Sequence, residues 1–356
     1  MKTNNNNKHR NFSNTNDANL NLCSDIPATK NIYFFNFYQK IVHLWQSMVS
    51  FQLIMLFIFI VIFGVLSFSA SYFVTLNNLL NVIRQAAPTL IVAVGMTIVI
   101  TSGGIDLSVG SMLAVGSVLS AIALSAGWHT TVTIAAIMLI GLVIGTINGF
   151  FIGYYGIAPF ITTLASLSIL RGIVLILTKG YSIPIPPKSP FILLGRGWVF
   201  GFPIPFLIAL FVVFCGIILL YRTRFGLYVT GIGTNEEAVR RAGINTKRIK
   251  LYIYALSGLL SSIAGMVVGA RLACGSSYTG IGFELTVITA VIMGGTSFSG
   301  GNGSMLGTIL GAVLLAIIGN GLILLHISAF YIQIVEGTIL LLAIWINQML
   351  SKKLKL

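Results

Sequence analysis

Long apolar runs separated by short polar stretches fill the chain from residue 51 to residue 348. A helix needs about 20 apolar residues to cross roughly 30 Å of hydrocarbon, and most of these runs have that length. We therefore predict an all-α, polytopic membrane protein with about ten transmembrane helices. The expected spans are residues 51–69, 86–101, 109–126, 131–153, 160–178, 204–220, 251–270, 284–296, 303–322 and 330–348.

The composition supports this class. Hydrophobic residues make up 56% of the 356 residues and charged residues only 8%, against about 25% charged in soluble domains. So few charges cannot cover a water-facing surface, which excludes a free cytosolic enzyme. The three cysteines show no paired spacing, no CxxC and no metal-ligand pattern, so we expect neither a disulfide framework nor a zinc site.

The net charge of +14 comes from 21 basic and 7 acidic residues. The basic residues lie mostly between apolar runs, so a positive-inside bias explains them better than nucleic-acid binding, and no nucleic-acid partner is expected. With the N-terminus inside, fifteen basic residues are cytoplasmic and Arg171 lies within a span. The outer side receives five: Arg84, Lys179, Lys188, Arg196 and Arg271. Both termini and residues 221–250 are predicted to be cytoplasmic.

Four regions are expected along the chain. Residues 1–30 are asparagine-rich and predict a disordered cytoplasmic tail without a cleaved signal peptide. Residues 31–50 carry aromatic side chains typical of a membrane interface. The transmembrane domain covers residues 51–348, and residues 349–356 form a basic cytoplasmic C-terminus.

Two features indicate an internal repeat with broken helices. Gly-Ser-Met-Leu occurs at 110–113 and again at 303–306, each time after a short apolar segment and a turn rich in Gly and Ser. Duplicated units with interrupted helices recur in transporters. The segments 86–101 and 284–296 are short, and each ends in a glycine-rich turn.

Glycines recur every four residues in several spans. Such spacing lets helix backbones approach closely, which predicts helix packing and leaves open whether some seams slide. The stripes are Gly141, Gly145, Gly149 and Gly153, then Gly303, Gly307 and Gly311, with Gly265 and Gly269 in a third span.

Polar residues within the spans are candidates for a translocation path. Asp106 follows Gly103 and Gly104 between two apolar runs, which fits an N-cap of the next helix, a broken helix lining the path, or both. Glu336 lies in the last span, where pairing with Arg171 is an option. The path candidates are Asp106, Ser108, Asn148, Asn320 and Glu336, and each could instead only bridge helices.

The polar segment 221–250 predicts a short helix with well-specified ends. Thr234 and Glu237 have capping-box spacing, two i,i+4 pairs (Glu236–Arg240, Glu237–Arg241) follow, and Gly243 suits the C′ position. A two-turn helix is unstable alone, so a knob that fits a partner's groove is predicted, with a solvated linker as the alternative. Its residues are Thr234, Asn235, Glu236, Glu237, Ala238, Arg240, Arg241 and Gly243.

This segment resembles the coupling region of ATP-binding-cassette importer permeases, whose pattern is Glu-Ala-Ala, three residues, then Gly. Residues 237–243 match it except for Val239, and the Leu-Pro that often follows is missing. Residues 101–110, 294–303 and 320–322 are similar to the ribose/xylose/galactose permease family, ribose permeases above all, and the likeness runs from about residue 50 to 348. Glu336 departs from that family, which often has lysine or a neutral residue there.

The resemblance implies a permease subunit that imports a small, ribose-like sugar across the bacterial inner (cytoplasmic) membrane. It implies a second permease chain in a homodimer or heterodimer, a separate cytoplasmic ATPase that uses ATP and Mg, and a periplasmic or extracellular sugar-binding protein. Residues 234–244 would receive the ATPase stroke, and the outer loops 180–203 and 271–283 would receive the binding protein. The chain has no Gly-Lys dipeptide, hence no phosphate-binding loop, so we expect a transporter subunit without bound cofactor, not an enzyme.

Two further functions remain open at this point. An ion-coupled secondary transporter would use Asp106, Glu284 or Glu336 for a proton or sodium. A permease for a related hydroxylated signal molecule would share all of these features. A membrane-embedded enzyme lacks a catalytic constellation in this sequence.

Overall fold

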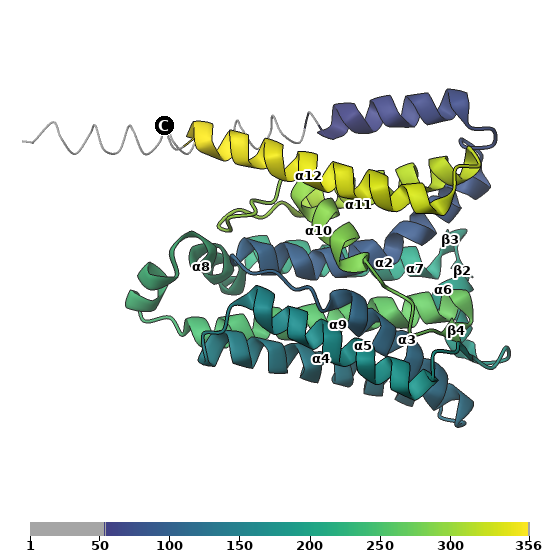
Figure 1. Cartoon of the computed structure of the whole chain (residues 1–356), viewed down its shortest axis with the longest axis horizontal. Helices are drawn as coiled ribbons and strands as arrows, with labels where there is room; N and C mark the ends of the chain where they lie inside the picture. The colour runs from purple at the N-terminus through teal and green to yellow at the C-terminus, as the bar shows by residue number, and fades with distance from the viewer. Residues whose placement is uncertain (1–52, 54, 355–356) are drawn as a thin grey trace, which may run out of the picture. The chain divides into compact units, whose positions relative to one another are not determined.

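Helices account for nearly all of the regular structure in the computed structural model, which describes residue 53 and residues 55–354 (Figure 1). The expected tail (1–30) and interfacial segment (31–50) lie outside these residues. The first described helix is Met55–Ser69. The later helices are α2 (Leu76–Thr101), α3 (Val109–Ser125), α4 (Thr130–Tyr154), α5 (Pro159–Thr178), η1 (Pro190–Ile192), α6 (Leu193–Arg196), α7 (Ile204–Arg222), α8 (Arg224–Arg241), α9 (Thr246–Leu272), α10 (Phe283–Met293), α11 (Met305–Leu324) and α12 (Ala329–Leu354).

The apolar helices coincide with the predicted spans. Among the described residues, six helices are long and apolar enough to cross a membrane: α2, α4, α5, α7, α9 and α11. Shorter apolar helices cover Met55–Ser69, Val109–Ser125, Phe283–Met293 and Tyr331–Trp345. The all-α polytopic architecture is confirmed, and the six long and four shorter apolar helices together are consistent with about ten membrane spans.

The start of α2 differs from the sequence expectation. A short span over 86–101 was expected, but the helix begins ten residues earlier, at Leu76. Thr75 caps it, since its Oγ1 accepts a hydrogen bond from the Asn78 N–H at 3.4 Å. Pro88 lies inside the helix without ending it.

Two helices, α2 and α9, form the centre of the packing. Helix α9 packs along α4, α3 and α2, and α2 also contacts α7 and α11. In their most apolar windows 78% of α2 and 72% of α9 residues are buried, against 22% in α4 and α5. The apolar outer faces of α4 and α5 are therefore left for lipid or another chain.

The glycine stripe of α4 lies directly against α9. A Cβ added to Gly145 would overlap the Tyr254 carbonyl oxygen, and one added to Gly149 would overlap the backbone of Leu251. Gly141 and Gly153 are equally close to α9. The two helix backbones can approach this closely only because these positions carry no side chain.

Two other seams are built in the same way. Gly116 of α3 meets Gly265 of α9, and a Cβ on either would overlap backbone atoms of the other helix. Gly307 and Gly311 of α11 lie against Gly294 and Ala290, at the end of α10 and within it. Gly303 lies against the Thr101 side chain instead.

Glycine-rich turns interrupt the chain between α2 and α3 (102–108) and between α10 and α11 (294–304). Gly103, Gly295, Gly300 and Gly301 all have positive φ, between 78° and 87°, which L side chains rarely adopt. Both copies of Gly-Ser-Met-Leu thus follow a helix and a glycine turn. The two units differ in length, however, because α2 has 26 residues and α10 has 11.

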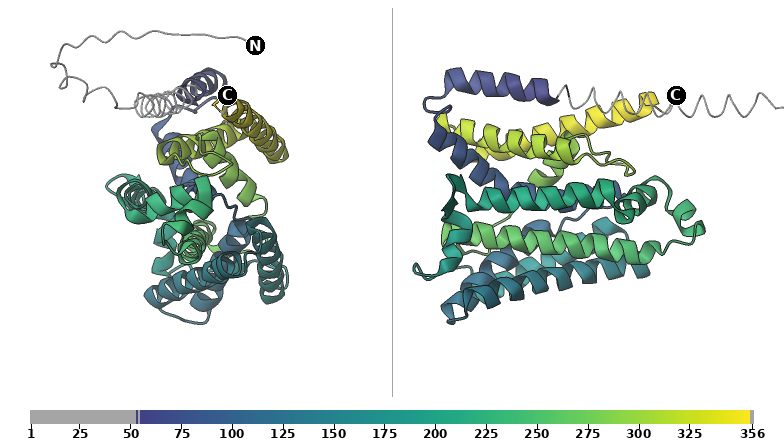
Figure 2. Two further views of the ribbon diagram at one scale, coloured as in Figure 1. Left: turned by 90° about the vertical axis from the view of Figure 1, so that its left-hand side faces the viewer. Right: turned by 180° about the vertical axis from the view of Figure 1, so that it is seen from behind.

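Short strands gather at one end of the helices, and α8 lies at the other (Figure 2). Strand β1 (Ile183–Pro184) pairs antiparallel with β4 (Cys274–Gly275), with Ile183 opposite Gly275. Strand β2 (Trp198–Val199) pairs antiparallel with β3 (Phe202–Pro203). We call these two ends the strand end and the α8 end.

Candidate functional site

Helix α8 bends at Asn235, whose φ of −160° and ψ of 95° are not helical. The Asn235 Oδ1 accepts a hydrogen bond from the Ala238 N–H at 3.0 Å and so caps the second part of the helix. The expected cap at Thr234 is therefore wrong by one residue, because the Thr234 hydroxyl instead donates to the Thr230 carbonyl at 2.9 Å. At the other end Gly243 has a φ of +82°, the conformation of a C′ glycine. We call residues 235–243 the coupling segment.

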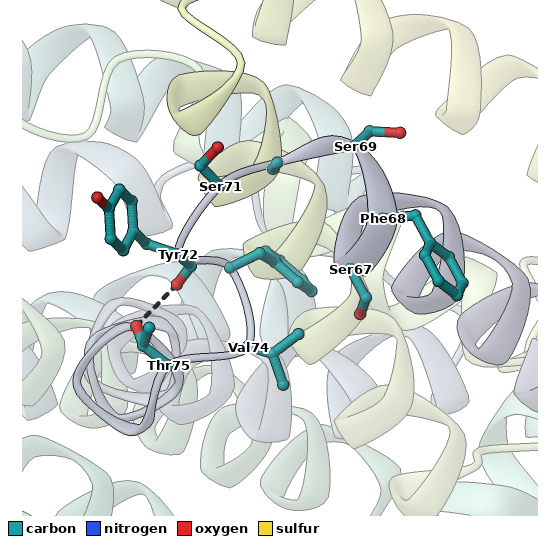
Figure 3. A pocket seen from close by; sticks show the side chains of 9 residues that line it. Ser67, Phe68, Ser69, Ser71, Tyr72, Val74 and Thr75 are labelled. Atoms are coloured by element: carbon teal, nitrogen blue, oxygen red, sulfur yellow. Dashed lines mark hydrogen bonds between the residues drawn. The ribbon is translucent and has the colours of Figure 1, made fainter.

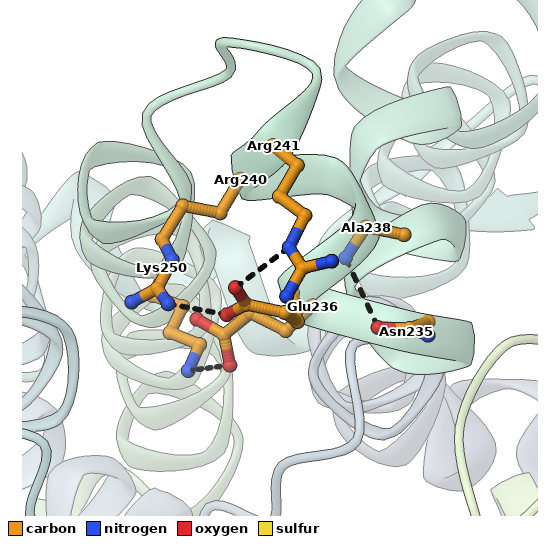
Figure 4. A network of polar contacts seen from close by, with 7 residues as sticks. Asn235, Glu236, Ala238, Arg240, Arg241 and Lys250 are labelled. Carbon is orange, nitrogen blue, oxygen red and sulfur yellow. Dashed lines mark hydrogen bonds and ion pairs between the residues drawn. The ribbon is translucent and has the colours of Figure 1, made fainter.

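Ion pairs hold the coupling segment in a pattern different from the expected one (Figure 4). Glu237 pairs with both Arg240 and Arg241, the latter at 3.1 Å. Glu236 does not pair with Arg240 but with Lys250 of α9, at 2.6 Å. The expected Glu236–Arg240 pair is corrected accordingly. The Lys250 contact fastens the segment to a central helix, although exposed pairs of this kind contribute only about 0–1 kcal/mol each.

The outer surface of the coupling segment combines small apolar and basic side chains. Ala238, Ala242, Arg240 and Arg241 are exposed, and Val239 is half-buried. The charges of Arg240 and Arg241 could orient such a surface against a partner.

Backbone contacts join Gly233, two residues before the coupling segment, to the turns 102–108 and 294–304, which we call the first and second helix breaks. The Gly301 N–H donates to the Thr101 carbonyl at 2.9 Å, and a Cβ on Gly233 would overlap both of these atoms. Gly300 lies against the Gly233 carbonyl oxygen and against Gly103. We call Gly103, Gly233, Gly300 and Gly301 the glycine junction. It was not foreseen, because nothing local in the sequence indicates that these three loops meet.

Asp106 is fully buried and joins the turn 102–108 to α9 directly and to α4 through Ser108. Its Oδ1 accepts hydrogen bonds from the Ser108 N–H at 3.0 Å and the Ser108 hydroxyl at 2.5 Å, and its Oδ2 accepts from the Ser257 hydroxyl of α9 at 2.7 Å. The Asn148 amide of α4 donates to Ser108 Oγ at 3.1 Å. The structure thus brings Asp106, Ser108 and Asn148 together. Ser257 was missed, since a lone serine in an apolar span carries no signal.

The capping role expected of Asp106 needs correction. Ser108, and not Asp106, is the N-cap residue of α3, and its side chain makes no capping bond. Asp106 instead accepts from Ser108 itself, which fixes the turn and not the first helical N–H groups.

The other two path candidates lie apart from this cluster. Asn320 and Asn78 exchange two hydrogen bonds of 3.0 and 2.9 Å, linking α11 to α2. Glu336 Oε2 accepts from the Thr286 hydroxyl at 2.8 Å. In the described residues no hydrogen bond connects either of them to Asp106.

Arg171 does not pair with Glu336. Its guanidinium donates to the backbone carbonyls of Ser277 and Thr279, the latter at 2.9 Å, and interacts electrostatically with Glu284. The pairing considered from the sequence is replaced by a link between α5 and the α9–α10 connection.

A cavity of about 540 Å³ opens at the strand end between α2, α3 and the connection from α9 to α10. We call it the strand-end cavity. Polar side chains on its wall include Gln85, Thr89, Arg271, Ser276 and Thr279. Arg271 was expected to lie on the outer side, but the cavity around it was not predicted.

A second hollow of about 510 Å³ lies at the turn that follows the first described helix. Residues 67–75 line it, and they include three serines and no charged side chain (Figure 3). The Thr75 hydroxyl is used locally, since it donates to the Tyr72 carbonyl at 2.7 Å. Within the described part of the chain, no cluster of His, Cys, Asp or Glu could hold a metal ion.

The family model described as "Branched-chain amino acid transport system / permease component" matches residues 78–344. The chain is 38% identical over 291 residues to the "Ribose import permease protein RbsC" of Escherichia coli (strain K12), covering 81% of this chain and 91% of the relative. It is 39% identical to the protein of the same name from Bacillus subtilis (strain 168), covering 82% and 90%. The "Xylose transport system permease protein XylH" of Escherichia coli (strain K12) is 32% identical, covering 79% and 87%. No solved structure matches.

Proposed function

We propose, from the premise that this chain belongs to the family of branched-chain amino acid transport system permease components, that it is the membrane permease subunit of an ATP-binding-cassette importer for a small, ribose-like sugar. The family name mentions amino acids, but the relatives reported above are ribose and xylose permeases over most of their length. The sugar is therefore the better-supported cargo.

The observation that carries the proposal is the coupling segment. It is capped by Asn235, closed by Gly243, and exposed at the α8 end beside both helix breaks. A separate ATPase that grips this segment would act on the glycine junction, and through residues 102–108 on the Asp106 cluster. ATP and Mg belong to that partner, and this chain supplies the moving path.

The same proposal fixes the partners and the orientation. The α8 end carries Lys247, Arg248 and Lys250 after the coupling segment, which supports a cytoplasmic location for it and for both termini. The outer loops 180–203 and 271–283 would then receive a sugar-binding protein. The apolar faces of α4 and α5 are available to lipid and to a second permease chain.

The candidate path residues keep distinct roles in the proposal. Asp106, Ser108 and Asn148 form one buried cluster that changes shape when the first helix break moves. Asn320 and Glu336 act elsewhere, as bridges between helices. The glycines of α4 and α11 provide packing seams.

The test is transport by the purified complex. The chain is reconstituted in liposomes with its candidate partner ATPase and sugar-binding protein, and uptake of labelled D-ribose is measured with ATP. Glu237→Lys and Gly243→Pro should reduce uptake at least tenfold without changing membrane insertion, because they disrupt the ion pairs and the C′ glycine. Glu237→Gln, which keeps the side-chain size and one of the two hydrogen-bond acceptors, is the milder comparison and should reduce uptake less than Glu237→Lys.

Two results would contradict this function. One is unchanged uptake and unchanged ATPase co-purification in both disruptive variants. The other is uphill uptake driven by a proton or sodium gradient in liposomes without ATPase, which would support an ion-coupled secondary transporter instead.

A further inference from the structure

Arg271 lies on the wall of the strand-end cavity and carries a guanidinium nitrogen that has no acceptor. Its Nη1 is buried and has no hydrogen-bond partner, and the same is true of Arg84 Nε on α2. Arg84 uses its Nη2 to donate to the Asn81 side chain at 2.7 Å. Neither arginine belongs to an ion pair among the described residues.

The surroundings of Arg271 are positively charged. Arg84 repels it electrostatically, and Arg196 donates from Nε to the Arg271 carbonyl at 2.7 Å, which brings a third guanidinium to this end. A buried guanidinium without an anion or acceptor is costly, so this arrangement favours arrival of a negatively charged group.

None of the five acidic residues of the described chain forms an ion pair with Arg271. Asp106 bonds two serines and Glu336 bonds Thr286. Glu284 attracts Arg171 electrostatically, although its buried Oε2 has no hydrogen-bond partner. Glu236 and Glu237 lie in the coupling segment at the α8 end. The described part of the chain therefore supplies no counter-ion to Arg271.

We propose that the strand-end cavity is a subsite for the transported solute, and that Arg271 there binds a carboxylate or phosphate group of that solute. Arg84 raises the local positive potential, and Gln85, Thr89 and Ser276 offer hydrogen bonds to hydroxyl groups. The volume of about 540 Å³ falls within the roughly 300–1,000 Å³ range of small-molecule sites. This inference rests on the proposed function and narrows its cargo to an anionic, polyhydroxylated molecule such as a sugar acid or sugar phosphate.

Direct binding to the purified permease–ATPase complex in nanodiscs tests the proposal. The probes are D-ribonate, D-ribose 5-phosphate, D-ribose and inorganic phosphate, measured by calorimetry in phosphatidylcholine discs. We expect at least one of the two anionic sugars to bind tenfold or more tightly than D-ribose. It should also bind more tightly than inorganic phosphate, since the hydroxyl groups contribute.

Substitutions test whether the preference for anionic sugars depends on the residues of the cavity. Arg271→Gln keeps hydrogen-bond donors but removes the charge, and should abolish the preference for the anionic sugar. Arg84→Gln should reduce the preference only in part. Lys188→Gln removes an exposed charge that does not line the cavity and should leave binding unchanged. Because the Arg271 charge is unpaired, Arg271→Gln should fold, which a thermal unfolding midpoint equal to or above that of the wild type would verify.

Three outcomes would overturn the inference. D-ribose could bind as tightly as the anionic sugars, or Arg271→Gln could leave the preference intact. Alternatively, discs containing phosphatidylglycerol could abolish binding, which would assign Arg271 to a lipid head group. If any of these occurs while ATP-driven uptake of D-ribose is observed, the proposed function stands and only the anionic subsite fails.

Discussion

Replacing Gly233 with alanine should separate ATP hydrolysis from transport. Gly233 lies two residues before the bend in α8, and an added Cβ would overlap the Thr101 carbonyl oxygen and the Gly301 nitrogen. These two atoms share the 2.9 Å hydrogen bond that joins the two helix breaks. A single added methyl group would therefore disrupt the contact through which motion of the coupling segment would reach the two helix breaks.

The magnitude follows from three contributions. Alanine gains up to about 1 kcal/mol of helix propensity over glycine. Overpacking a tight contact costs about 1–3 kcal/mol, and loss of the Gly301–Thr101 hydrogen bond about 0.5–1.5 kcal/mol. A net cost near 2 kcal/mol changes the balance between coupled and uncoupled arrangements by a factor of roughly 30. We expect the solute transported per ATP hydrolysed to fall about tenfold or more.

The measurement is uptake and ATP hydrolysis in the same proteoliposomes, so that their ratio is obtained. Gly231→Ala is the matched control, because it adds the same methyl group to the same helix and meets only the side-chain Cγ2 of Val239, 2.9 Å away. The reasoning is refuted if Gly233→Ala keeps the wild-type ratio, or if Gly231→Ala lowers it equally. Size-exclusion profiles of both variants establish that each protein is folded.

Three further changes test the packing and the buried polar contacts. Gly145→Val should lower the free energy of unfolding by more than about 3 kcal/mol, because the added side chain overlaps α9, and the protein should no longer give a monodisperse size-exclusion peak. Gly172→Val is the control: nothing lies within 4 Å of its added Cβ, so the free energy of unfolding should change by less than about 1 kcal/mol. Asp106→Leu should lower the free energy of unfolding by about 2–4 kcal/mol, because it leaves buried hydrogen-bond donors without acceptors, and Asp106→Asn should lower it less. Equal thermal unfolding midpoints for the two variants would contradict the role given to Asp106 in the buried cluster. Asn78→Leu and Asn320→Leu should be non-additive by about 1 kcal/mol in a double-mutant cycle of thermal stability, and strict additivity would rule out their pairing.

The membrane helices could be predicted because one physical rule, burial of backbone polar groups in hydrocarbon, forces long apolar runs into helices. This rule predicts that a transmembrane helix exists more reliably than it predicts the residues at which the helix begins and ends. At α2 the cap is Thr75, well before the apolar stretch near 86, and the helix includes Asn77, Asn78 and Arg84. These polar residues are tolerated because their side chains find partners such as Asn320 and Asn81.

The polar contacts were less predictable because they depend on which loops meet. The sequence indicated a capped helix near 234–244, but not that Asn235 would take the cap from Thr234 or that Glu236 would reach Lys250, fourteen residues away. Asp106 was recognised as a buried acid, whereas its partner Ser257 is 151 residues distant. Such pairings follow from tertiary packing, about which a local sequence pattern carries no information.

The glycine contacts also bear on which seams move and which do not. Helices α3, α4 and α9 are joined through Gly116, Gly145 and Gly265, where backbone meets backbone. Helices α10 and α11 are joined in the same way through Gly294 and Gly311. Sliding along either seam would drive a backbone carbonyl into its neighbour, since close-packed interfaces change between discrete arrangements and do not deform continuously. Motion is therefore expected between the two groups, across α2, which contacts both, and at the glycine junction where α8 meets both helix breaks.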